Sequence, residues 1–170
     1  RQMCIRDRTG TGKTALVMEL MEELEKEAKQ NKLKLKTAYV NCSENRTETV
    51  ILIDILSQLN PSKNYPRLGW NRAKAIDEFN KVLDDLAGDV LIILDEVDYV
   101  LRESGDDILY RLSRIKTKSN ISSILISNDI KVSDYIKPKT QSAIGRVRII
   151  FSLYTSVELF EILKDRSELA

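Results

Sequence analysis

Apolar residues recur at helical spacing in three long segments of the chain. These segments are residues 13–30, 47–59 and 70–87. Apolar side chains three or four positions apart line one face of a helix, so each segment predicts an amphipathic helix. In the first segment, Leu16, Leu20 and Leu24 form the apolar stripe among Glu and Lys residues. Further stretches with helical signals are residues 106–117, 132–136 and 155–169.

Runs of apolar residues predict the strands. The strand-like segments are residues 34–41, 89–94, 121–127 and 147–151. The last three are too short for an ordinary helix and are bounded by turns, which is typical of strands buried on both faces of a parallel sheet. Strands and helices alternate along the chain. This order predicts an α/β fold with an open, mostly parallel sheet flanked by crossover helices.

A phosphate-binding motif stands directly at the start of the first predicted helix. It consists of Thr9, Gly10, Thr11, Gly12, Lys13, Thr14 and Ala15. Glycines let the backbone curl so that consecutive N–H groups face one anion, and the helix N-terminus adds its positive end. We therefore expect Lys13 to reach the β- and γ-phosphates of ATP, and the Thr14 hydroxyl to take Mg²⁺.

The first eight residues depart from this motif. A complete loop reads G-x-x-x-x-G-K-[ST], which places a glycine where the chain has Asp7, and a carboxylate there would face the phosphates. Residues 3–8, Met-Cys-Ile-Arg-Asp-Arg, resemble one translated frame of a common transposon-end sequencing adapter. We therefore interpret residues 1–8 as a scar that replaces the native first strand, and residues 9–170 as the native domain. The alternative is an authentic but degenerate loop.

Polar residues follow two of the buried strands. Asp95 and Glu96 come directly after the run at 89–94, and Asn128 follows the run at 121–127. Ligands of open α/β sheets bind beyond the carboxyl ends of the strands, so these side chains should face the phosphates. Asp95 suits a Mg²⁺ ligand, Glu96 the base that polarises the attacking water, and Asn128 a contact to that water or the γ-phosphate. Taken alone, the acidic pair could be a solvated turn and the asparagine a turn cap.

Composition narrows the class of protein. The chain has 170 residues, of which 42% are apolar and 31% charged, and its formal net charge is +1. It contains no histidine and two cysteines, which excludes His-based triads and a disulfide framework. No apolar run approaches the roughly 18 residues that span a bilayer, and no signal peptide opens the chain, so we expect a cytoplasmic protein without membrane contact. Any contact to DNA must be local, because the net charge is small.

These motifs, in this order, resemble those of the AAA+ ATPases. The segments that resemble the archaeal origin-recognition and replication-initiator family are residues 93–100, 126–129, 149–154, 158–159 and 162–163. The resemblance covers about residues 9–170 and implies a P-loop NTPase fold with ATP and Mg²⁺ as cofactors. It further implies slow, switch-like ATP hydrolysis in a protein that recognises double-stranded origin DNA and helps to load the replicative helicase.

The chain also departs from that family. Members continue into a helical lid and a winged-helix domain, and we expect both to be absent because the chain looks truncated at both ends. Members also offer an arginine to the nucleotide of a neighbouring subunit; Lys139 or Arg146 could take this role, and neither is assigned. Self-association of the protein through the ATP site is a further possibility. The alternatives are another P-loop ATPase of the signalling or transposition-helper type, or a remnant that binds no nucleotide.

Overall fold

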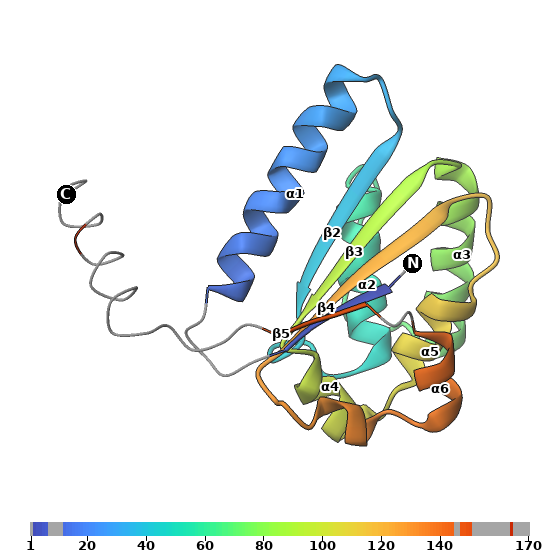
Figure 1. The fold of residues 1–170 in the computed structure, drawn as a ribbon. Helices are drawn as coiled ribbons and strands as arrows, with labels where there is room; N and C mark the ends of the chain where they lie inside the picture. Colours follow the sequence, from blue (N-terminus) through green and yellow to red (C-terminus); the bar gives the residue numbers. More distant parts are fainter. Residues whose placement is uncertain (1, 7–11, 145–146, 151–163, 165–170) are drawn as a thin grey trace.

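A computed structural model describes residues 2–6, 12–144, 147–150 and 164 of the chain (Figure 1). Its centre is a sheet of five described strands, all parallel, in the order β2-β3-β4-β1-β5. The strands are β1 (Gln2–Arg6), β2 (Leu35–Asn41), β3 (Asp89–Asp95), β4 (Asn120–Ser127) and β5 (Val147–Ile150). The predicted open, parallel α/β sheet is confirmed.

Helices lie on both faces of this sheet, with α1 on one side and α2 and α3 on the other (Figure 1). The helices are α1 (Lys13–Gln30), α2 (Glu48–Leu59), α3 (Arg72–Leu86), α4 (Val97–Ser104), α5 (Asp107–Arg114) and α6 (Pro138–Ala143), with a 3-10 helix η1 (Val132–Tyr135). Neither α4 nor α6 was predicted, and the helix predicted at 155–169 lies outside the described residues apart from Lys164. Within the described ranges, no helix has the length and apolar character needed to cross a membrane.

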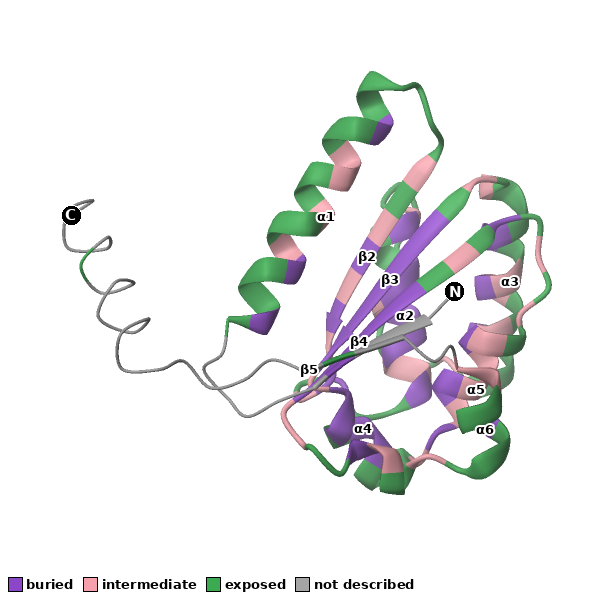
Figure 2. Ribbon diagram, viewed as in Figure 1, coloured by how far each residue is buried: buried purple, intermediate pink, exposed green. Residues whose placement is uncertain are grey.

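The side chains of β3 alternate between two hydrophobic cores. Val90, Ile92 and Leu94 belong to the larger core, which also contains the buried apolar residues of α2 and α3. Leu91 and Ile93 belong to the smaller core beneath α1. Successive side chains of a strand point to opposite faces of a sheet, so β3 is buried on both of them. Figure 2 shows β3 as a mostly buried strand, which confirms the prediction made from its continuous apolar run.

The apolar stripe predicted for α1 is partly wrong. Leu16 and Leu20 are 50% and 39% exposed. The residues that α1 turns toward the sheet are Val17, Met21 and Leu24. A helix has about 3.6 residues per turn, so a uniform step of four residues rotates about 40° beyond a full turn and drifts away from the contact face. Steps of four and then three residues, as from Val17 to Leu24, stay on that face.

Side-chain caps determine where two of the helices begin. The carbonyl oxygen of the Asn71 side chain accepts a hydrogen bond from the Lys74 N–H at 2.8 Å. Thr47 caps α2 in the same way, by accepting from the Val50 N–H at 3.4 Å. A cap residue satisfies an N–H group that has no partner inside the helix, so the helix starts directly after it. We predicted that this helix starts at residue 70. The Asn71 cap explains why α3 begins at Arg72 instead.

Strand β1 lies between β4 and β5 in the described sheet. Its backbone pairs with both neighbours, and Ile5 is 3% exposed in the smaller core. Residues 2–6 therefore occupy the place of the first strand that we expected to have been overwritten. Backbone pairing does not depend on where a segment comes from, so the division into a scar at 1–8 and a native domain at 9–170 stays a prediction. Asp7 lies outside the described residues.

Candidate nucleotide-binding site

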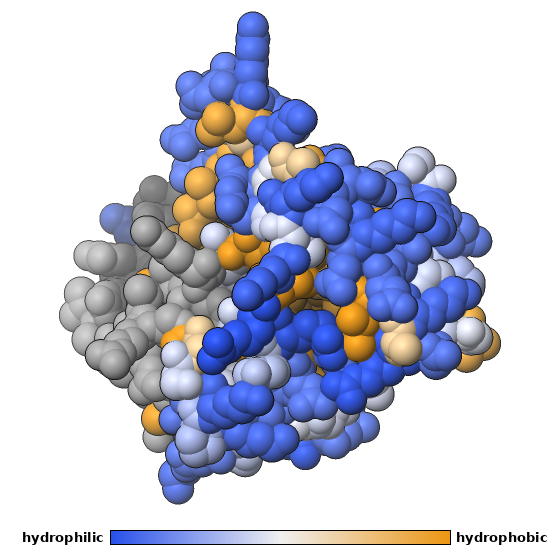
Figure 3. All heavy atoms as spheres, turned by 90° about the vertical axis from the view of Figure 1, so that its right-hand side faces the viewer, coloured by the Kyte–Doolittle hydropathy of each residue, from blue (hydrophilic) through white to orange (hydrophobic). Residues whose placement is uncertain are grey.

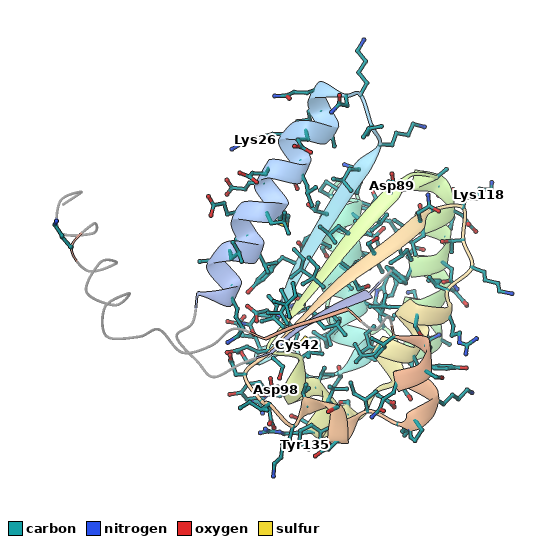
Figure 4. All side chains as sticks on the ribbon, in the orientation of Figure 1. Lys26, Cys42, Asp89, Asp98, Lys118 and Tyr135 are labelled. Atoms are coloured by element: carbon teal, nitrogen blue, oxygen red, sulfur yellow. The ribbon has the colours of Figure 1, made fainter. Side chains whose placement is uncertain are left out.

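The predicted site residues that the structure describes meet where β3 and β4 end and α1 begins. Figure 4 shows Cys42 and Asp98 near this edge of the sheet, whereas Asp89 lies at the opposite end of β3. The described members of the phosphate motif are Gly12, Lys13, Thr14 and Ala15, and those outside the described residues are Thr9, Gly10 and Thr11. The carboxyl ends of parallel strands meet at one edge, which is where an α/β sheet places its ligand.

The chain enters α1 through a left-handed glycine. Gly12 has a φ of 76°, a conformation that glycine adopts without steric cost. Lys13 is the first residue of the helix and is only 4% exposed, while Thr14 and Ala15 are exposed. The tight turn therefore brings the lysine and the N-terminus of an 18-residue helix to the same place.

Asp95 and Thr14, the two predicted magnesium ligands, are in direct contact. The Thr14 hydroxyl donates a hydrogen bond to Asp95 Oδ2 at 2.6 Å, although the two residues are 81 positions apart. The other carboxylate oxygen, Oδ1, accepts the N–H of Glu96 at 2.8 Å. Asp95 is 3% exposed, so a buried carboxylate faces the start of α1 with both oxygens hydrogen-bonded. A buried charge needs such hydrogen-bond partners. The assignment of Thr14 and Asp95 as magnesium ligands stays a prediction.

The two residues predicted to act in hydrolysis also touch. The Asn128 side-chain amide donates to Glu96 Oε1 at 3.2 Å. Glu96 itself has a φ of 51° and a ψ of 40° at the start of α4, a left-handed conformation that is uncommon outside glycine. Such backbone outliers cluster at functional sites, where they aim a side chain that a regular helix would turn away. A carboxylate held through one oxygen can orient a water molecule with the other.

Asp98 joins the end of β4 to the start of α4. It is 4% exposed, and its Oδ1 accepts hydrogen bonds from the Ser127 hydroxyl at 2.9 Å and from the Asn128 N–H at 3.2 Å. The Ser127 hydroxyl oxygen in turn accepts the N–H of Asp129 at 2.9 Å. These bonds fix the backbone that carries Asn128. Asp98 is the third acidic residue after the β3 run, and we predicted no role for it from the sequence.

Tyr39 is a member of the site that the sequence analysis missed. Its hydroxyl donates to Asp95 Oδ2 at 2.9 Å. Burial, followed by the hydrogen bond to Asp95, raises the pKa of the Tyr39 phenol well above its usual value, so it stays protonated and acts as a donor. Tyr39 reaches Asp95 because of the strand register. Strand β2 runs parallel to β3 with Asn41 opposite Asp95, and Tyr39 lies two residues before Asn41 on β2.

Cys42 does not act as a nucleophile at this site. Its side chain is fully buried, and its N–H donates to the carbonyl oxygen of Asp95 at 2.8 Å. Burial, reinforced by the negative charges of Asp95, Asp98 and Glu96, raises the pKa of the thiol to about 12. The thiol is therefore neutral at physiological pH, and the same carboxylates that raise its pKa favour a bound cation.

A cavity of about 550 Å³ lies away from these residues, between α3 and α5. Figure 3 views the molecule from this side, which is covered mainly by hydrophilic residues. The lining of the cavity includes Arg72 and Arg111, and both form salt bridges. Arg72 pairs with Asp107 at 2.6 Å, and Arg111 pairs with Glu48 at 2.7 Å. Because these arginines are already paired and no motif residue lines the cavity, we do not assign the nucleotide to it.

Comparison with known families and proteins identifies what the chain is similar to. A family model described as "AAA domain" matches residues 7–134. An ORC1-type DNA replication protein of Methanosphaera stadtmanae is 35% identical over 167 residues, which are 96% of this chain and 42% of the relative. ORC1-type DNA replication protein 1 of Sulfolobus acidocaldarius is 38% identical over 165 residues, or 95% of this chain and 40% of the relative. The chain thus spans about two fifths of the length of these relatives.

Solved structures match the fold over nearly the whole chain. The Aeropyrum pernix ORC1 protein in complex with DNA has a TM-score of 0.85 at 29% identity, covering 98% of this chain and 43% of that one. The Aeropyrum pernix ORC2 protein, solved as ADPNP-ADP complexes, has a TM-score of 0.81 at 27% identity, covering 99% and 46%. The resemblance to the archaeal initiators that we drew from the motifs is confirmed. The chain belongs to the AAA domain family, and the two relatives compared above are ORC1-type DNA replication proteins.

Proposed function

We propose that this chain is the ATP-binding and ATP-hydrolysing module of a DNA replication initiator. The observation that carries the proposal is the hydrogen bond between Thr14 and Asp95, with the Glu96–Asn128 contact beside it. These two contacts bring together a phosphate motif, two carboxylates and an amide, which are groups that ATP hydrolysis uses. The complete protein would bind double-stranded origin DNA and help to load the replicative helicase.

Nucleotide binding would use the start of α1. The backbone of residues 9–15 would surround the phosphates, and Lys13 would contact the β- and γ-phosphates. Thr14 and Asp95 fit a magnesium ion because they offer a hydroxyl and a carboxylate oxygen, the hard ligands that Mg²⁺ prefers, only 2.6 Å apart. Bound magnesium would neutralise part of the phosphate charge. These residues thus account for the ATP and Mg²⁺ that the motifs imply.

Hydrolysis would depend on Glu96 and Asn128. Glu96 would accept a hydrogen bond from a water molecule and hold it in line with the γ-phosphorus. The water oxygen would form a bond to phosphorus and release a proton to Glu96 while the bond to the β-phosphate oxygen breaks, which yields ADP and phosphate. Asn128 would keep the Glu96 side chain in place through the 3.2 Å hydrogen bond and would be near enough to sense the γ-phosphate.

Thermal unfolding with and without MgATP tests the ATP-binding part. We use the chain with Asp7→Gly, called the D7G chain, because a complete phosphate loop has glycine there. MgATP at about 100 times its dissociation constant should add about 2.7 kcal/mol to the free energy of unfolding, a clear rise in melting temperature. The unmodified chain should respond less, since the Asp7 carboxylate repels phosphate. Failure of the D7G chain to bind MgATP, measured by calorimetry, would refute the proposal.

The replication part is tested on the protein encoded by the complete gene. Its support is that the matched Aeropyrum pernix ORC1 structure is a complex with DNA. The complete protein should bind duplex DNA from its own origin more tightly than unrelated duplex at the same salt concentration, in an electrophoretic mobility assay. Equal binding to both duplexes, or none, would limit the proposal to an ATPase of another type.

A further inference from the structure

Asp95 receives hydrogen bonds from three separate segments of the chain. Its Oδ2 accepts the hydroxyls of Thr14 at 2.6 Å and Tyr39 at 2.9 Å, and its Oδ1 accepts the Glu96 N–H at 2.8 Å. Thr14 comes from α1, Tyr39 from β2, and Glu96 directly follows β3. Of the two hydroxyls, only that of Thr14 belongs to the phosphate motif. Tyr39 therefore contacts the carboxylate without belonging to the loop that binds the phosphates.

Tyr39 is itself held from two sides. The side-chain amide of Gln58 in α2 makes a reciprocal pair with the Tyr39 backbone: the Tyr39 N–H donates to Gln58 Oε1 and Gln58 Nε2 donates to the Tyr39 carbonyl oxygen, both at 2.8 Å. The Tyr39 ring packs against the smaller core, which includes Val17 and Ile93. A side chain with its backbone and ring both fixed loses little further freedom when its hydroxyl donates a hydrogen bond.

We propose that Tyr39 is a positioning residue that holds Asp95 in the orientation required for magnesium-dependent ATP binding, with Gln58 holding Tyr39. The inference rests on the proposed function. A threonine hydroxyl has one proton and two lone pairs, so Thr14 can donate to Asp95 and offer an oxygen to Mg²⁺ at once. The Glu96 N–H holds only Oδ1, so Oδ2 would otherwise depend on this shared hydroxyl. The neutral Tyr39 hydroxyl supplies a second donor to Oδ2 and adds no charge.

Groups that hydrogen-bond to a metal-binding carboxylate orient it, and their loss typically lowers metal affinity about 10- to 100-fold. Tyr39→Phe removes the hydroxyl and keeps the ring, so the core packing is preserved. We expect the ratio of the ATP dissociation constants in EDTA and in Mg²⁺ to fall about tenfold in the D7G chain with Tyr39→Phe. The dissociation constant in EDTA should not change, because Tyr39 touches Asp95 and not the phosphate motif.

Isothermal titration calorimetry of ATP, in Mg²⁺ and in EDTA, measures both constants, and a thermal melt confirms that each variant folds. The matched control is Tyr110→Phe in α5, whose ring contacts Arg114 and Lys139 and not the site. It should leave the ratio unchanged. Gln58→Ala should lower the ratio in the same direction as Tyr39→Phe, but less, because the hydroxyl is still present.

The same substitution made in a variant that already carries Asp95→Asn shows whether Tyr39 acts through Asp95. With Asp95→Asn already in place, adding Tyr39→Phe should cause no further fall in the ratio, since the carboxylate to be positioned is gone. The inference is overturned if the ratio is the same with Tyr39 and with phenylalanine, or if it falls equally in both backgrounds. If the D7G chain binds no ATP even in Mg²⁺, the proposed function is overturned and this inference with it. If ATP binding by the D7G chain depends on Mg²⁺ but Tyr39→Phe does not change the ratio, only the inference is overturned.

Discussion

Replacing Lys13 by alanine in the D7G chain is expected to lower the affinity for MgATP by at least about 100-fold, or about 2.8 kcal/mol. Lys13 is 4% exposed at the first position of α1, where its ammonium would meet the β- and γ-phosphates. A charged hydrogen bond in such a place contributes more than one in water, and the loss of the positive charge adds to the effect. Alanine is the best helix former, so the fold should survive.

Calorimetry measures this loss, and the control lies in the same helix. Lys26 is an exposed lysine of α1 near its far end (Figure 4), and Lys26→Ala should bind MgATP like the parent. Circular dichroism and a thermal melt verify that both variants are folded. Equal affinity in the Lys13→Ala variant and the parent would remove Lys13 from the site, and the phosphate motif would need another explanation.

Glu96→Gln is expected to leave MgATP binding nearly intact and to lower the rate of hydrolysis about 100-fold or more. Glutamine keeps the size of the side chain, and its carbonyl oxygen can still accept the hydrogen bond from Asn128. It cannot draw a proton from the attacking water as a carboxylate does. A change that lowers the rate without weakening binding marks a group that acts in the transition state.

Single-turnover hydrolysis and calorimetry on the same variant separate these two effects. The matched control is Glu103→Gln, also in α4, where Glu103 forms an exposed ion pair with Arg46 at 3.4 Å. Such surface pairs contribute little, so this variant should bind and hydrolyse ATP like the parent. A Glu96→Gln variant with a normal rate would place the base elsewhere; Asp98, 4% exposed and two residues away, would be the next residue to test.

The sheet and the motif residues could be predicted because each had a local signal. The apolar run at β3 revealed a strand buried on both faces, and the polar residues after it marked the edge where ligands bind. Tyr39 could not be assigned in the same way. A tyrosine in a strand is ordinary, and its contact to Asp95 exists only because β2 pairs beside β3 in one register. Such register is a tertiary property that no local pattern contains.

The errors also have physical causes. Leu16 and Leu20 were assigned to the apolar stripe of α1 from their four-residue spacing, but the helix turns Val17, Met21 and Leu24 toward the sheet. Helix α4 was missed because its first turn overlaps the acidic residues after β3, which were interpreted only for their chemistry. Helix α4 starts at Val97, directly after Glu96, whose left-handed conformation is one that glutamate rarely adopts.

The pairing between Gln58 and Tyr39 also affects what can attach to the molecule. In the described sheet β2 is an edge strand, and unpaired backbone groups on such an edge invite strand addition and aggregation. The Gln58 amide occupies the N–H and C=O of Tyr39 as another peptide chain would, so the edge is closed at that point. Lys36, exposed on the same strand, adds a charge that an incoming strand would have to bury. The Gln58 side chain, which we propose holds Tyr39 in place, therefore also protects the β2 edge from pairing with a strand of another molecule.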